Sequence, residues 1–425
     1  MNPHDLKKLY KENRYVDVIE LVSQFPEQTL QNEWDYFYYT QSFYKLKKYD
    51  KCLEVYKNFR QIFPKSSRLD SIICWSLYHS KIKQFDSQTD DLEQLQKQVD
   101  FTLERCSQVE YSPFSTIILK FVDILFDQNN INYLLALKYL ATLDNNKLND
   151  HPYSFANKEG KMIVTPSDRE KWFTKASKAL ENLQFYTKCI ECVDAALSSP
   201  VVFQNNNEYW LSYRKAKCLY QLGELFEAES LLLVLTNSFK NWNIYHLLFK
   251  IYRDTNRPKE ALNVAALAST FDQFHKARVG LYSELATFYL SYDMEEQAEL
   301  QIKLIRLIRI KEGWRSDKPT MDYVLREGID QLTWKEVSRL LNIQWQTTIA
   351  ENKHFLEGTI RIVFPHGQSG FIIDENGKSY YFSRRDFMVH NNDIKPNQKV
   401  KFTLTYRVDK KDGENKPNAT DIMSV

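Results

Sequence analysis

The sequence predicts a mainly α-helical protein in which an α-solenoid, an array of paired helices, precedes a small five-stranded β-barrel. Only 10 of the 425 residues are glycine, about 2% against an average of roughly 7%, and this scarcity suits helices packed on helices. Apolar residues recur at helical spacing over most of the chain and at every second residue near its end. Five of the ten glycines lie from Gly358 onward, so the architecture should change near residue 357.

The clearest helical unit covers residues 209–236. It contains a small residue, Ala216, then Gly223 at a turn, then an apolar stripe that includes Ala228. The two units that follow carry alanines in the equivalent place, Ala261 and Ala298, at spacings of 33 and 37 residues. Small residues where helices cross, separated by turns at a regular interval, predict stacked helix–turn–helix units.

These units resemble the tetratricopeptide repeat, a helix–turn–helix unit of 34 residues. More divergent copies precede them, one closing at Pro64 and one at Pro200, and residues 65–165 are expected to be helical without a clean repeat. The resemblance implies a solenoid over residues 1–317 whose extended surface binds a protein partner or a second copy of the chain. Most aromatic side chains in such an array fill its core, so no single groove residue is proposed as a site.

Two features of the array raise the question of a chemical role. Cys189 and Cys192 form one CxxC pair, which we attribute to packing rather than to zinc or redox chemistry, because both lie on a repeat helix and no second pair exists. The basic residues of the helix at 301–318 either contact a polyanion or form a solvated face, and we expect the solvated face. They are Lys303, Arg306, Arg309, Lys311 and Arg315.

A connector is expected at residues 318–356, after a break at Asp317–Pro319. Thr333 and Glu336 form a capping box that predicts a helix start, as Ser167 and Glu170 do within the array. The connector is rich in large apolar residues and poor in glycine and serine, so it should be a packed junction rather than a free linker.

The last segment, residues 357–425, is expected to form the barrel. Val400, Phe402, Leu404 and Tyr406 alternate with polar residues, which predicts a strand with one buried face. Asn376-Gly377 is a strong hairpin turn because both residues accept positive φ. With strands before and after these, five short strands are predicted, a number that suits an OB-type barrel.

The same segment resembles the cold-shock domain in four places and in the correct order. These are Gly358-Thr-Ile-Arg361, Gly370-Phe371-Ile372, Tyr380-Tyr381-Phe382 and Pro417-Asn-Ala419-Thr-Asp-Ile422. The resemblance implies binding of single-stranded RNA or DNA, with bases stacked on aromatic rings and basic residues holding the backbone. The expected nucleic-acid-binding residues are Phe371, Tyr381, Arg361, Lys378, Arg384 and Arg385. Alternation should place Phe371 and Tyr381 outward, with Tyr380 and Phe382 inward.

The sequence also departs from the cold-shock pattern. Ile362 stands where the family has tryptophan, Ser369 replaces an aromatic residue, and Ser383 with Arg384 replaces histidine and phenylalanine. About half of the stacking platform is therefore missing, although Arg384 and Arg385 can contribute phosphate contacts or guanidinium stacking. Two functions follow: an adaptor that binds RNA in preference to DNA, and a scaffold subunit whose barrel docks on protein.

Enzymatic chemistry finds little support in the sequence. Phosphate-binding glycine loops and paired metal-binding histidines do not occur, so no catalytic residue, cofactor or metal is expected. The net charge of +2 gives the whole chain no polyanion-binding character, whereas residues 358–425 hold 11 Lys+Arg against 8 Asp+Glu. The first residues lack an apolar run and no membrane helix is predicted, so we expect a cytoplasmic protein with reduced cysteines.

Overall fold

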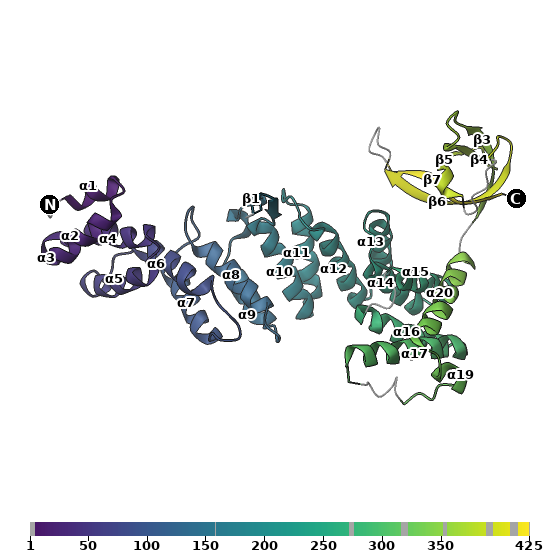
Figure 1. Cartoon of the computed structure of the whole chain (residues 1–425), viewed down its shortest axis with the longest axis horizontal. Helices are drawn as coiled ribbons and strands as arrows, with labels where there is room; N and C mark the ends of the chain where they lie inside the picture. The colour runs from purple at the N-terminus through teal and green to yellow at the C-terminus, as the bar shows by residue number, and fades with distance from the viewer. Residues whose placement is uncertain are drawn as a thin grey trace. The chain divides into compact units, whose positions relative to one another are not determined.

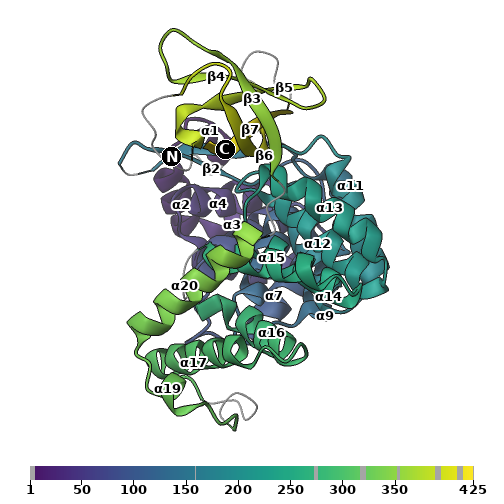
Figure 2. The ribbon, with the colours of Figure 1, turned by 90° about the vertical axis from the view of Figure 1, so that its right-hand side faces the viewer.

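The computed structural model describes residues 5–157, 159–271, 276–315, 322–351, 355–387, 394–408 and 415–424. Contacts within the chain divide it into two compact units, Met1–Glu224 and Leu225–Val425. The first unit consists of successive helices and one short hairpin, and the second consists of further helices followed by a closed barrel of five strands (Figures 1 and 2). The predicted fold class, a paired-helix solenoid followed by a five-stranded barrel, is confirmed.

The first unit is built from helices that pack mainly on their neighbours in sequence, as α4 does on α5 and α10 on α11. This local packing is what a stacked helical array requires. The helices are α1 (Leu6–Lys11), α2 (Tyr15–Gln24), α3 (Pro26–Thr29), α4 (Glu33–Lys45), α5 (Tyr49–Ile62), α6 (Asp70–Leu77), the π-helical turn η2 (Tyr78–Ile82), α7 (Leu92–Arg105), α8 (Phe114–Phe126), α9 (Tyr133–Leu140), the 3-10 turn η3 (Asn145–Lys147), α10 (Asp168–Asn182), α11 (Tyr186–Leu197) and α12 (Asn207–Leu222).

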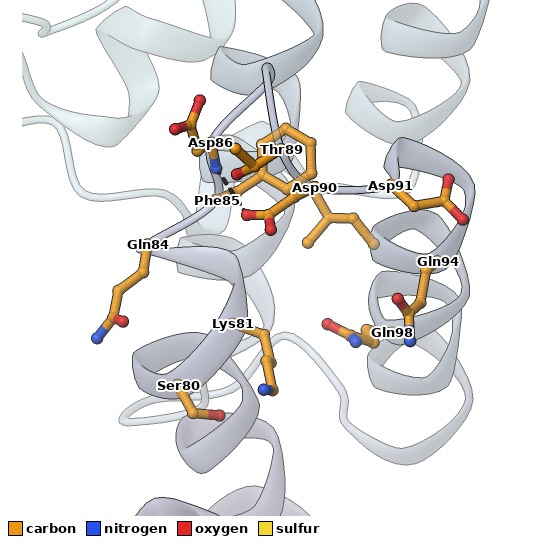
Figure 3. A pocket seen from close by; sticks show the side chains of 11 residues that line it. Ser80, Lys81, Gln84, Phe85, Asp86, Thr89, Asp90, Asp91, Gln94 and Gln98 are labelled. Carbon is orange, nitrogen blue, oxygen red and sulfur yellow. Dashed lines mark hydrogen bonds between the residues drawn. The ribbon is translucent and has the colours of Figure 1, made fainter.

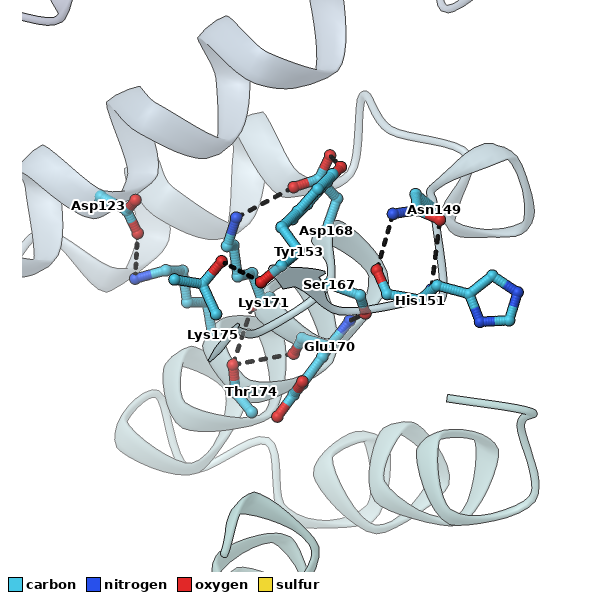
Figure 4. A network of polar contacts seen from close by, with 11 residues as sticks. Asp123, Asn149, His151, Tyr153, Ser167, Asp168, Glu170, Lys171, Thr174 and Lys175 are labelled. Atoms are coloured by element: carbon cyan, nitrogen blue, oxygen red, sulfur yellow. Dashed lines mark hydrogen bonds and ion pairs between the residues drawn. The ribbon is translucent and has the colours of Figure 1, made fainter. Parts of the chain in front are cut away.

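The expectation that residues 65–165 are wholly helical is wrong at its end, where β1 (Tyr153–Ala156) and β2 (Met162–Thr165) form an antiparallel hairpin. Aromatic and β-branched residues flank a turn that contains Gly160 at φ +78°, a combination that favours strands over helix. The hairpin is attached to α10, since the Tyr153 hydroxyl donates to Asp168 Oδ2 at 2.8 Å (Figure 4). Lys171 pairs with the same carboxylate at 3.1 Å.

The capping box predicted at Ser167 is half formed. Ser167 Oγ accepts from the backbone N–H of Glu170 at 3.1 Å, as expected. The Glu170 carboxylate, which is fully buried, turns instead to the start of α12 and accepts from Gln204 N, just before that helix, and from Nδ2 of its first residue, Asn207, both at 2.8 Å. This carboxylate therefore ties one helix pair to the next rather than closing its own helix end.

The helices of the second unit follow the same plan, since α14 packs on α15 and α16 on α17. The alanines that identified the repeat, Ala228, Ala261 and Ala298, are all fully buried, which lets neighbouring helices approach closely. The elements are α13 (Leu225–Ser238), α14 (Trp242–Asp254), α15 (Pro258–Thr270), the 3-10 turn η4 (Lys276–Arg278), α16 (Val279–Leu290) and α17 (Glu295–Glu312).

The described residues of the connector include the helices α19 (Glu327–Asp330) and α20 (Trp334–Glu351). One half of the predicted capping box is seen at the start of α20: Glu336 Oε2 accepts from the backbone N–H of Thr333 at 2.8 Å, and it also accepts from the Thr333 hydroxyl at 2.7 Å. Helix α20 packs on α15 and α17, and Trp345 is fully buried with its ring stacked 6.1 Å from that of Tyr282. The break predicted at residues 317–319 lies outside the described residues.

The barrel is formed by β3 (Leu356–Val363), β4 (Ser369–Asp374), β5 (Ser379–Ser383), β6 (Lys399–Val408) and β7 (Asn415–Ser424). Around it the strand order is β3-β4-β5-β7-β6, and β6 closes on β3. The β5–β7 pair is parallel, whereas the other pairs are antiparallel. The crossover from β5 to β6 and back through β7 makes this a Greek-key rather than a simple meander.

The barrel interior follows the predicted alternation. Val400 and Phe402 on β6 are fully buried, and Leu404 packs against the same core; the side chain of Tyr406 lies outside the described residues. The predicted hairpin turn forms, with Gly377 at φ +81°, although Asn376 is not among the residues with positive φ.

Candidate nucleic-acid interface

The centre of the candidate interface is a pair of aromatic residues on β4 and β5. Phe371 lies directly opposite Tyr381, with ring centroids 5.8 Å apart and ring planes at 74°. Their neighbours Ile372, Tyr380 and Phe382 are at most 3% exposed and fill the barrel, whereas Tyr381 is 37% exposed. Phe371 and Tyr381 therefore share the outer face of the sheet, as the alternation predicts.

Two further rings that sequence reasoning missed extend this pair. The Phe364 ring lies 5.8 Å from that of Phe371 at 90°, and the His366 ring lies 5.7 Å from that of Phe364. Together Phe364, His366, Phe371 and Tyr381 form a continuous aromatic row, which we call the aromatic platform.

A β-bulge explains why Phe364 was missed. The pairing of β3 with β4 shifts by one residue at Arg361, so that Ile360 opposes Ile372 and Ile362 opposes Phe371. A strict alternation from the buried Ile360 would place Ile362 and Phe364 inside. The bulge reverses this, since Val363 packs on the core while Ile362 is 46% exposed.

The motif glycines serve the barrel rather than the ligand. A Cβ atom on Gly370 would lie 2.0 Å from the carbonyl oxygen of Ile362, and one on Gly358 would lie 2.6 Å from that of Ile373. Both positions therefore require glycine for close packing of neighbouring strands.

Three of the four predicted cations lie near the aromatic platform. Arg361 is exposed at the bulge, across from Phe371. Arg384 and Arg385 belong to the 3-10 turn η5 (Arg384–Asp386), which follows β5 directly. The backbone N–H of Arg384 donates to the Gln368 carbonyl at 2.7 Å, which ties this turn to the loop that carries His366.

The fourth cation, Lys378, lies at the other end of the hairpin. Its Nζ sits 5.6 Å from the centre of the Tyr380 ring, which belongs to the barrel interior rather than to the platform. Its backbone N–H donates to Asp374 Oδ1 at 2.8 Å, and the Tyr380 hydroxyl donates to Asp374 Oδ2 at 3.0 Å. Desolvation opposes the shift, but these hydrogen bonds hold the pKa of Asp374 below its ordinary value. Lys378 therefore lies beside the turn, next to Asp374 and Tyr380, rather than beside Phe371 and Tyr381.

Three of the five basic residues at 301–318 have a role that neither alternative anticipated, whereas Arg315, just beyond α17, is exposed as expected. Lys303 donates to the Asp330 carbonyl and Arg306 to the Tyr323 carbonyl, and Lys311 lies 5.1 Å from the Trp334 ring. These cations hold the connector against the helix, which removes them from the set of candidate polyanion contacts.

The cysteine pair of α11 is part of the helical core. Cys189 is fully buried, and its thiol donates to the Ser177 carbonyl at 3.2 Å. Burial raises the pKa of the Cys192 thiol to about 12, which disfavours the reactive thiolate. Within the described part of the chain, no group of three or more His, Cys, Asp and Glu residues is placed to hold a metal ion. No described helix is both long and apolar enough to span a membrane.

Comparisons with known proteins give a family model and distant structural likenesses. Residues 209–327, less than half of the chain, match a family described as a domain of unknown function (DUF7017). No curated protein matches the sequence.

Among solved structures, MamA from Desulfovibrio magneticus RS-1 is 14% identical with a TM-score of 0.35, over 47% of this chain and 96% of that chain. The C-terminal part of a TPR repeat-containing protein from Cytophaga hutchinsonii is 16% identical with a TM-score of 0.28, over 75% and 98%. Human IFIT1, solved as a dimer with PPP-AAAA, is 12% identical with a TM-score of 0.35, over 75% and 70%. At these values the likenesses carry no argument about function.

Proposed function

We propose that this protein is a non-enzymatic adaptor that binds single-stranded nucleic acid, preferably RNA, through its C-terminal barrel. The helical array binds a protein partner or a second copy of the chain. The observation that supports the proposal most directly is the aromatic platform, whose central pair, Phe371 and Tyr381, faces outward on adjacent strands. Exposed rings on a sheet offer stacking surfaces for any base, and nearby arginines supply phosphate contacts.

The barrel topology supports the same assignment. Five strands in a closed Greek-key barrel suit the OB type, of which the cold-shock domain is a kind. In OB barrels the face of the second and third strands binds oligonucleotides, together with the loop between the first two. Here those elements are β4, β5 and the loop at 364–368, which are the elements that carry the aromatic platform.

A scaffold function is the second candidate, and Ile362 favours it. This aliphatic side chain is 46% exposed beside Phe371, where the cold-shock family has a tryptophan. An exposed aliphatic and aromatic patch suits docking on protein as well as it suits a base.

Fluorescence anisotropy of the full-length protein with labelled single-stranded RNA and DNA, at low and physiological salt, tests the proposal. The adaptor function predicts binding that weakens with salt, because arginine contacts release counterions from the backbone, and tighter binding of RNA. A folded protein that binds neither strand at low salt would contradict nucleic-acid binding and favour the scaffold function.

A further inference from the structure

A groove of about 520 Å³ lies in the first unit between α2 and α5, and α4 forms its floor. The floor is apolar: Tyr36, Tyr39 and Phe43 line it from α4, and Val55 lines it from α5. Tyr36 and Phe43 are buried, whereas Tyr39 and Val55 are half-buried. Large apolar side chains at the bottom of an open groove indicate a surface that another apolar side chain can cover.

The same arrangement of helices occurs in the second unit, where the corresponding groove is filled. Helix α16 begins 246 residues after α4 (279 against 33), and α17 begins 246 residues after α5 (295 against 49), so Tyr282 corresponds to Tyr36. Helices α2 and α15 are the second helices of the preceding pairs. In the second unit α20 packs on α15 and α17, and its Trp345 ring stacks on that of Tyr282 at 6.1 Å, with 9° between the ring planes. A helix of this chain therefore occupies the groove that is open in the first unit.

The burial of matched residues on α5 and α17 shows the difference between the two grooves. Leu300 and Leu304 of α17 are 6% and 1% exposed, in the helix on which α20 packs. The residues at the same positions of α5 are Glu54 and Asn58, which line the open groove and are exposed. The open groove thus combines an apolar floor like that under α20 with a more polar rim.

The rim is weakly basic. Lys48 and Lys51 line the groove together with one carboxylate, Glu54, so these residues give the lining a net charge of +1. Glu54 is paired with Lys51, with 2.7 Å between Oε2 and Nζ. Lys48, at the end of the groove that precedes α5, is exposed and supplies the excess charge. An occupant with acidic residues on its rim-facing side would match this charge.

We propose that this groove binds an amphipathic α-helix of the partner protein. The helix inserts a large aromatic side chain toward Tyr36 and Tyr39, as α20 inserts Trp345 toward Tyr282, and it presents acidic residues to Lys48. Helices that lie in apolar grooves are recognised through such anchors, and a buried aromatic anchor contributes much of the binding free energy. The proposal rests on the partner-binding part of the proposed function and names the segment that the partner contributes.

A second cleft of the first unit, between η2 and α7, does not offer such a floor. Figure 3 shows that polar and acidic side chains line it, among them Asp86, Asp90 and Asp91. This cleft supplies a control instead, because Lys81 on its wall is an exposed lysine that does not line the groove between α2 and α5.

The test uses the full-length protein and a fluorescein-labelled peptide of residues 333–351, the α20 sequence, as the probe helix. Two altered peptides carry Trp345→Ala or the pair Lys335→Glu and Arg339→Glu. Fluorescence anisotropy gives the dissociation constants. The Trp345→Ala peptide should bind about tenfold more weakly because it lacks the anchor. The acidic peptide should bind about threefold more tightly because the rim is basic.

Three variants of the protein locate the binding. Val55→Glu places a charge on the floor and should weaken binding of the parent peptide about tenfold. Lys48→Glu, at an exposed position that tolerates substitution, should abolish the preference for the acidic peptide. Lys81→Glu makes the same change of charge in the cleft of Figure 3 and should leave all three peptides unchanged. Circular dichroism checks that each variant is folded.

Equal binding of the parent and Trp345→Ala peptides would overturn the proposal, and so would unchanged binding in a folded Val55→Glu variant. Equal effects of Lys48→Glu and Lys81→Glu would refute the basic rim. A dimer in sedimentation that Val55→Glu converts to a monomer would overturn the assignment to a partner protein, because the groove would then hold a second copy. RNA binding by the barrel is measured with another ligand on another unit of the chain, so the two proposals fail or stand separately.

Discussion

Replacing both central rings of the aromatic platform tests the nucleic-acid interface most directly. Each base that stacks on an aromatic side chain contributes about 1–3 kcal/mol. Phe371 and Tyr381 are in ring contact at 5.8 Å, so their contributions should not be fully additive. We expect the double variant Phe371→Ala/Tyr381→Ala to lose about 2–4 kcal/mol of binding free energy, or roughly 30- to 1000-fold in Kd.

The same substitution should cost little stability. Both rings lie on the outer face of the barrel rather than in its core, so the loss in free energy of unfolding should be about 1 kcal/mol, well below that of a buried phenylalanine. Anisotropy with a short labelled RNA gives the change in Kd, and thermal unfolding followed by circular dichroism gives the change in stability. Tyr111→Ala is the matched control, since Tyr111 is 86% exposed in the first unit.

An unchanged Kd in a double variant that remains folded would refute the platform as the binding surface. A loss of binding accompanied by an equal loss in Tyr111→Ala would refute it as well, because the effect would not be specific to these rings. Loss of RNA binding with retained folding and an inactive control substitution is the result that the stacking argument requires.

Three further predictions concern stability, each measured by chemical or thermal unfolding. Gly370→Ala forces a Cβ atom onto the carbonyl of β3 and should cost roughly 3 kcal/mol, whereas Gly280→Ala meets no atom within 4 Å and should be neutral or stabilising. Trp345→Ala should cost about 3–5 kcal/mol because the ring is fully buried; a loss below 1 kcal/mol would show that α20 is dispensable. Desolvation raises the pKa of Glu284, but hydrogen bonds and charge from His246 and Lys250 on α14 outweigh it and lower the pKa to about 2. The ionised Glu284 carboxylate should contribute about 1–2 kcal/mol to the free energy of unfolding, after solvent screening. This contribution should be complete above the pKa of Glu284 in the unfolded chain and should be lost as pH falls from about 5 toward 2. Glu284→Gln should therefore differ from the parent at pH 7 and approach it at pH 3.

Some elements could be predicted from the sequence because their information is local. The turn at Asn376-Gly377 needs positive φ at its glycine, and the alternation in β6 needs one buried face, so neither depends on the rest of the chain. The repeat alanines could be predicted for the same reason, because a small residue that recurs where helices cross is most simply explained by close helix packing. Such features are determined by backbone preference and by burial.

Other elements depended on contacts that spacing does not encode. The bulge at Arg361 changes which residues of β3 face outward, and it is specified by pairing with β4 rather than by β3 itself. Lys303 and Arg306 of α17 were predicted to be solvated, yet they donate to a connector that lies up to 27 residues further along the chain. The hairpin at 153–165 was missed because its two strands of four residues are too short to stand out from the helical pattern around them.

The bulge also provides a substitution that separates the two candidate functions. It turns Ile362 outward beside Phe371, where the cold-shock family has a tryptophan, and the side chain is exposed enough for a larger ring to fit without disturbing the core. If the platform binds nucleic acid, Ile362→Trp adds a stacking surface and should tighten RNA binding by about 1–2 kcal/mol, or roughly tenfold. If the barrel docks on protein, the same substitution alters a fitted aliphatic contact and should weaken capture of the partner while RNA binding stays absent. Measuring both RNA binding and partner binding in this one variant therefore separates the two functions. Tighter RNA binding would support the adaptor, and weaker partner binding without RNA binding would support the scaffold.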